Sequence, residues 1–147
     1  MYDKILVAVD GSEIAQRALQ EAIKLARQGS TRLRILHVVD ETPLWQYPDG
    51  VGVNYEAVIE RFRETGRQVG AEALEAARAE GVEAESALLE LAGAGRVADV
   101  IVQDAKDWGA RLIVLGTHGR RGVAHLVLGS VAEGVSRAAS TPVLLVR

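Results

Sequence analysis

The sequence predicts an α/β fold in which a doubly wound parallel sheet carries helices on both faces. Three observations lead to this prediction. Short, almost continuous apolar runs recur along the chain, as is typical of strands that are buried on both faces of a sheet. Segments with apolar residues at helical spacing separate these runs. Because strand and helix alternate, right-handed crossovers are expected to place the strands parallel to one another.

The individual elements follow in regular order. An apolar run at residues 5–9 ends at Asp10, and Ser12 is placed to cap a helix that Gly29 closes. Further strands are expected at residues 33–39, 84–91, 111–115 and 142–146, and further helices at residues 55–80, 95–105 and 131–139. The topology rules for such folds favour one open five-stranded parallel sheet in the order 3-2-1-4-5.

Two segments need separate treatment. Residues 42–54 contain two prolines and the aromatic Trp45 and Tyr47, and they are expected to form a long surface loop. That loop either tucks its aromatic side chains onto the core or folds over a ligand. In the helix at residues 55–80, Gly66 and Gly70 each cost about 1 kcal/mol of helix stability relative to alanine. Close packing of this helix against the sheet would explain both glycines.

The composition limits the classes of function. The 147 residues fit a single domain, residues 1–147, with 48% hydrophobic and 25% charged residues. A net charge of -3 argues against a nucleic-acid partner, and the lack of cysteine excludes disulfides, thiolate nucleophiles and cysteine-based zinc sites. The start of the chain lacks a signal-peptide pattern, and no apolar stretch approaches the length of a membrane span. We therefore expect a cytoplasmic protein with no membrane partner.

The segment after the fourth strand carries the pattern most indicative of function. Gly116 and Gly119 are followed by nine residues and then by Gly129 and Ser130, directly before the last helix. Glycine allows positive φ angles and lets phosphates approach backbone N–H groups, and the first amides of a helix favour negative charge. Ser130 could cap the helix and also contact phosphate. The alternative is that these glycines only form turns.

Other nucleotide-binding motifs are absent. No lysine follows a glycine, which excludes a Walker A loop, and only Gly11 follows the first strand closely, which excludes a dinucleotide fingerprint. A Ser-Gly-Gly pyrophosphatase loop is missing from the same turn. Ligands of doubly wound sheets bind beyond the carboxyl ends of the strands where the winding direction reverses, which here lies between the first and fourth strands. Asp10 and Gly116 are expected to face that crevice.

The glycine pattern, together with residues 4–12, 36–40, 112–116 and 141–146, resembles the universal stress protein family along the whole chain. The resemblance implies the α/β fold, a homodimer and membership of the ATP-binding type. It implies that Asp10 contacts the ribose, that Ala8 and Val9 lie near the adenine, that the backbone of Val38 meets the adenine edge and that Leu115 packs nearby. The ribose-phosphate positions that it implies are Gly116, Gly119, Gly129, Ser130 and Val131. Arg111 departs from the acidic residue of many members, but it lies at the far end of its strand.

Several side chains near the motif have two interpretations. Asp10 either contacts ribose or a metal, or it bonds the N–H groups near Ser12 at the start of the helix. Arg120 or Arg121 either pairs with phosphate or faces solvent. An Mg2+ or Mn2+ ion bound with ATP would be held by phosphate oxygens and water, with Asp10 as its one carboxylate. The spacing of His118 and His125 suits no metal pair, and His37 is expected to be a core histidine with a satisfied hydrogen bond.

The hypothesis that results is an ATP-binding regulatory module in the stress response. No nucleophile, base and orienting group assemble visibly in the sequence, so catalysis is weakly supported. A slow ATPase and a dimerisation scaffold that binds no nucleotide are the alternatives. The last strand, Val143–Val146, is apolar throughout and would lie at the sheet edge, where it is expected to form the homodimer interface. The alternative is that a helix or loop covers this edge.

Overall fold

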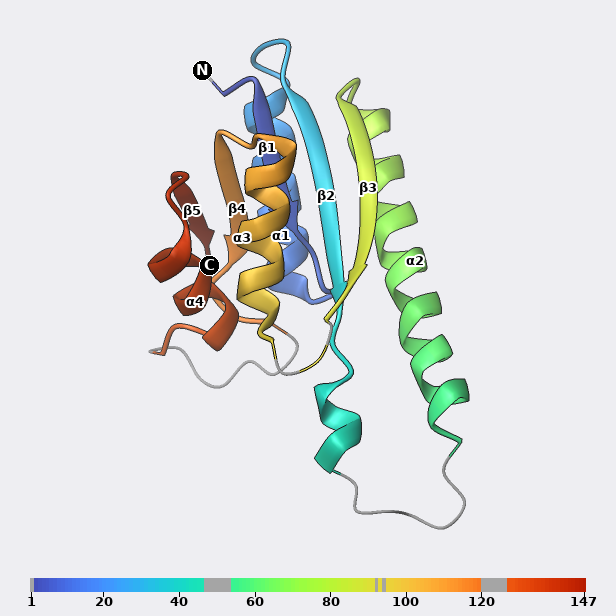
Figure 1. Cartoon of the computed structure of the whole chain (residues 1–147). Helices are drawn as coiled ribbons and strands as arrows, with labels where there is room; N and C mark the ends of the chain where they lie inside the picture. The colour runs from blue at the N-terminus through green and yellow to red at the C-terminus, as the bar shows by residue number, and fades with distance from the viewer. Residues whose placement is uncertain (1, 47–53, 92, 94, 120–126) are drawn as a thin grey trace.

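The computed structural model describes residues 2–46, 54–91, 93, 95–119 and 127–147. Its centre is one five-stranded, entirely parallel sheet, and the strand order β3-β2-β1-β4-β5 confirms the predicted order (Figure 1). The strands are β1 (Lys4–Ala8), β2 (Arg32–Val39), β3 (Glu83–Glu90), β4 (Leu112–Gly116) and β5 (Val143–Val146).

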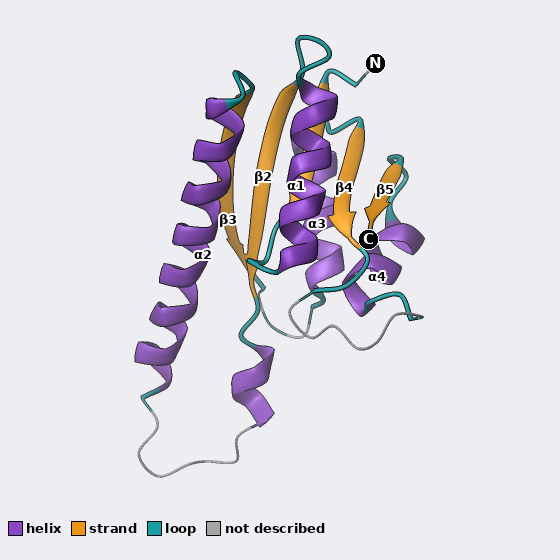
Figure 2. Ribbon diagram, turned by 180° about the vertical axis from the view of Figure 1, so that it is seen from behind, coloured by secondary structure: helices purple, strands orange, loops and turns teal. Residues whose placement is uncertain are grey.

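Helices cover both faces of the sheet, as the sequence predicted (Figures 1 and 2). They are α1 (Glu13–Ala26), α2 (Tyr55–Ala79), α3 (Val97–Trp108) and α4 (Ser130–Ala138). Helices α1 and α2 lie on one face and α3 and α4 on the other. The strands are added in one direction from β1 to β3 and in the other direction from β4 to β5, so right-handed crossovers place the two pairs of helices on opposite faces. Ile5 and Val7 of β1 pack toward α1 and α2, whereas Leu6 packs toward α3 and α4. The continuous apolar runs in the sequence thus correspond to strands buried on both faces.

Four local expectations need correction. Thr42–Gln46 forms a short 3-10 helix, η1, rather than loop, with Pro43 in its first turn and Leu44 buried. Helix α1 ends at Ala26, before Gly29, and α3 begins at Val97 rather than residue 95. Helix α3 continues to Trp108 because the left-handed residue that ends it is Gly109, with φ 78°. Tyr47 and the side chain of Trp45 lie outside the described part of the chain, so their predicted placement is untested.

Close packing of α2 against the sheet is confirmed at Gly66 and not at Gly70. A Cβ atom at Gly66 would lie 2.6 Å from Cδ2 of His37 and 2.7 Å from Cδ1 of Leu88. At Gly70 the nearest atom would be the Cβ of Ser86 at 3.7 Å, which is an ordinary contact distance. Only the first of the two glycines is therefore required by the packing of this helix.

The described helices include none that is both long and apolar enough to cross a bilayer. Cytoplasmic location stays a prediction of the sequence.

Candidate functional site

A cavity of about 560 Å³ opens at the carboxyl edge of the sheet, between the two layers of helices. Every predicted site residue in the described part of the chain lines it: Ala8, Val9, Asp10, Val38, Leu115, Gly116, Gly119, Gly129, Ser130 and Val131. Arg120, like Arg121 and His125, lies outside the described residues, so its predicted contact with phosphate is untested. The strand order explains the assembly, because β1 lies between β2 and β4 and all three strands end at the same edge.

Close contacts within the chain account for the three motif glycines. A Cβ atom at Gly116 would overlap Cγ2 of Ile14, and one at Gly119 would lie 2.7 Å from Oδ2 of Asp10. A Cβ atom at Gly129 would lie 2.9 Å from the carbonyl oxygen of Thr117. None of the three appears among the described glycines with positive φ, so the positive φ expected of Gly116 and Gly119 is not observed. These positions need glycine because no space is left for a side chain.

The amino end of α4 forms one wall of the cavity. Gly129 is the N-cap residue, in an extended conformation, and no side chain in the described part of the chain bonds to the cap. Ser130 is the first helical residue, so the expectation that it caps the helix was wrong. The first three helical amides, those of Ser130, Val131 and Ala132, have no acceptor within the helix, and all three residues line the cavity. Such an array of N–H groups favours an anion.

Two residues that the motif did not single out hold this wall in place. Thr117 is buried; its N–H donates to Val146 O at 2.8 Å, and its carbonyl accepts from the N–H of Gly129 at 2.8 Å. His118 contacts the carbonyl of Val127 through Nε2, so Nε2 carries the hydrogen, and Nδ1 accepts from the Thr117 hydroxyl at 3.0 Å. His118 therefore joins the two sides of the glycine segment. The feature of the sequence that could have indicated this role is the position of His118 between Gly116 and Gly119.

Two carboxylates mark the ends of neighbouring strands. Oδ1 of Asp10 accepts from the N–H of Ser12 at 2.9 Å, which confirms its role at the start of α1, while Oδ2 lies next to Gly119. Ser12 in turn caps α1, as predicted. Asp40 follows β2 and accepts from the N–H of Thr42 at 2.9 Å in the same way. Within the described residues, no group of three or more His, Asp or Glu side chains is arranged to hold a metal ion.

The β2 side of the cavity is formed partly by α2, which the sequence did not place at the site. His37 is nearly buried, and its Nδ1 donates to the carbonyl of Val9 at 2.9 Å, which confirms it as a core histidine. Phe62 and Thr65 of α2 line the cavity beside it, together with Pro43 of η1. Their helix is distant in sequence from the strand ends that it meets, so no local pattern could have predicted this contact.

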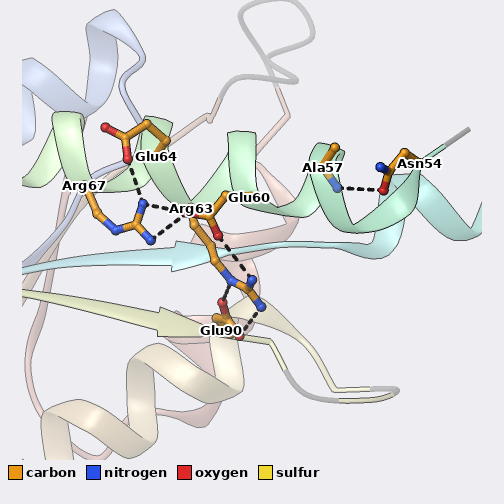
Figure 3. Close-up of polar contacts among 7 residues, drawn as sticks. All are labelled: Asn54, Ala57, Glu60, Arg63, Glu64, Arg67 and Glu90. Atoms are coloured by element: carbon orange, nitrogen blue, oxygen red, sulfur yellow. Dashed lines mark hydrogen bonds and ion pairs between the residues drawn. The ribbon is translucent and has the colours of Figure 1, made fainter.

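An ion-pair network holds the outer half of α2 against the end of β3 (Figure 3). Arg63 bonds Glu90, the last residue of β3, through Nε and Nη2, and also pairs with Glu60. Arg67 bonds Glu60 and Glu64. The pKa of Glu90 is lowered from its usual value, mainly because the carboxylate accepts hydrogen bonds from Arg63. Exposed pairs of this kind contribute little to global stability, but they fix the orientation of this part of α2.

The universal stress protein family model matches residues 1–147, the entire chain. The chain belongs to the universal stress protein family. It is similar to the universal stress protein YxiE of Bacillus subtilis, with 35% identity over 149 residues that span both chains completely. A similar protein from Thermus aquaticus is 38% identical over 148 residues, again over the full length of both.

Solved structures of universal stress proteins share the fold. A family protein from Burkholderia pseudomallei superimposes with a TM-score of 0.78 at 36% identity, covering 98% of this chain and 95% of its own. One from Archaeoglobus fulgidus, in complex with dAMP, has a TM-score of 0.68 at 30% identity, covering 99% and 98%. Another universal stress protein, in complex with cAMP, has a TM-score of 0.72 at 26% identity, covering 99% and 97%. Relatives of this chain thus bind adenine nucleotides.

Proposed function

We propose that this protein binds ATP in the cavity at the carboxyl edge of the sheet and acts as a nucleotide-responsive regulatory module in the stress response. One observation carries the proposal: a single cavity joins the amides at the start of α4, which suit phosphate, to an apolar region around Val38 and Leu115, which suits a base. The adenine nucleotides bound by the relatives from Archaeoglobus fulgidus and in the cAMP complex support it.

The ligand would lie across the three central strands. Its phosphates would accept hydrogen bonds from the amides of Ser130 and Val131, and its ribose would meet Asp10. On the sequence alone we also place Arg120 at the phosphates. An Mg2+ or Mn2+ ion would enter with ATP, coordinated mainly by phosphate oxygens and water with Asp10 as its one protein carboxylate, because such ions keep few protein ligands in nucleotide sites.

Calorimetric titration of nucleotide-stripped protein with Mg-ATP tests the proposal. We expect binding in the micromolar range, and at least about tenfold weaker binding of AMP, because each phosphate lost removes charge-assisted hydrogen bonds. No heat with any nucleotide would contradict the proposal and favour a scaffold that binds none. The relatives in complex with dAMP and cAMP give a second candidate, a sensor of nucleoside monophosphates. AMP or cAMP binding tighter than ATP would favour that candidate.

We further propose a homodimer through β5. Among the described strands, this one lies at the edge of the sheet and pairs with β4 alone, and Leu144 is 37% exposed. An exposed apolar edge strand is a template for pairing with a second chain. Light scattering at micromolar concentration should give a dimeric mass, and Leu144→Lys should give a monomer. Gln20→Lys adds the same charge at an exposed site on α1 and should remain dimeric. A monomeric unmodified protein would contradict the proposal.

A further inference from the structure

Helix α2 runs antiparallel to β2 and β3, and its contacts fix the level of each residue along the sheet (Figure 2). Gly70 lies over Ser86, and Gly66 lies over Leu88 and its β2 neighbour His37. A step of four residues along the helix therefore corresponds to a step of two residues along the strand. The helical step covers about 6.0 Å and the strand step about 6.6 Å. One turn further out, Phe62 comes level with the last residues of β2 and β3.

The ion pair between Arg63 and Glu90 independently supports the placement of Phe62 beside the ends of β2 and β3 (Figure 3). Glu90 is the last residue of β3 and pairs in register with Val39, the last residue of β2. Phe62 precedes Arg63 directly and lies on the same helical face as Gly66, which faces the sheet. Phe62 is half-buried and lines the cavity.

The two sides of the cavity differ in chemistry. Strands β2 and β4 flank β1, so their ends lie about 10 Å apart. The β4 side carries the amides of Ser130 and Val131, which favour anions. The β2 side carries Val38, Pro43 and the Phe62 ring. A nucleotide with its phosphates on the first side places its base on the second.

We propose that Phe62 is a specificity-determining residue on which the base of the bound nucleotide stacks. This inference rests on the proposed function. Aromatic rings stack on nucleobases through their flat faces, and a leucine of similar size supplies apolar surface without that face. The ion pair from the neighbouring residue restricts the outer turn of α2, so the ring is in place before the ligand arrives.

Phe62 is the only phenylalanine in the chain, which allows a direct test. Protein labelled with 4-fluorophenylalanine carries one fluorine, so its 19F spectrum reports on this ring alone. Adenosine and ATP should both shift that resonance, and inorganic tripolyphosphate should not. If neither adenosine nor ATP moves the resonance under conditions in which calorimetry detects ATP binding, the inference is overturned and the proposed function stands.

Variants of Phe62 give the second measurement. Phe62→Leu should weaken ATP and adenosine by the same factor, about tenfold, and leave tripolyphosphate binding unchanged. Phe62→Tyr keeps the flat ring and should keep the affinity of the unmodified protein. Equal losses for all three ligands would show a merely structural role and overturn the inference, as would unchanged ATP affinity in the leucine variant. If the unmodified protein binds no nucleotide, the proposed function and this inference both fall.

Discussion

Replacing Ser130 with aspartate should weaken ATP binding strongly without harming the fold. Ser130 is the exposed first residue of α4 and lines the cavity. A carboxylate at this position stabilises the helix by about 0.3–1 kcal/mol through the helix dipole, so the variant should unfold at the same temperature or slightly higher. The same charge would lie beside the phosphates. Two like charges about 4 Å apart repel by about 1 kcal/mol in bulk water and about 4 kcal/mol at a protein surface, which weakens binding about 5- to 1,000-fold.

Ser130→Asn is the matched control, since it has nearly the same shape as the aspartate and no charge. Calorimetry with ATP and with adenosine, together with thermal unfolding, distinguishes the two variants. Only the aspartate variant should lose ATP, and both should bind adenosine as the unmodified protein does. This selective loss is the reverse of the pattern expected for Phe62→Leu, which weakens adenosine and ATP alike. Equal ATP affinity in the two Ser130 variants would show that the phosphates do not bind at the start of α4.

Alanine at Gly66 and alanine at Gly70 should change stability in opposite directions. Both residues are buried on the sheet-facing side of α2, and alanine is the better helix former by about 1 kcal/mol. At Gly70 the added methyl group finds ordinary contact distances, so we expect stabilisation by about 0.5–1 kcal/mol. At Gly66 it would overlap the His37 ring, which a hydrogen bond to Val9 O holds in place, so we expect destabilisation by about 1–3 kcal/mol.

Urea denaturation of the two variants measures both free energies of unfolding, and each variant is the control of the other because the chemical change and the helix are the same. For a domain of this size, each kcal/mol corresponds to roughly 2–4 °C in the melting temperature. Similar stabilisation by both substitutions would mean that α2 does not approach His37 as closely as described, and the level assigned to Phe62 would then lose its basis.

Much of the candidate site could be predicted because its chemistry is local in sequence. Asp10 ends an apolar strand, and Gly116, Gly119 and Gly129 follow another at a fixed spacing. Parallel strands bring such ends to one edge of the sheet, so the topology rules sufficed to bring these residues together. The function of the glycines was less evident, because only the folded chain shows that Ile14, Asp10 and Thr117 occupy the space a Cβ would need.

The sequence by itself determined the alternation of strands and helices, the parallel sheet and the strand ends that line the cavity, because hydrophobic periodicity and connection rules act over short stretches of chain. Only the tertiary structure decided which residues from distant parts of the sequence lie opposite those strand ends. The place of Phe62 depends on the antiparallel passage of α2 over β2 and on the ion pair between the neighbouring Arg63 and Glu90, two residues that lie 27 positions apart in the sequence. Contacts at such separation arise from packing the whole sheet, and no local pattern encodes them.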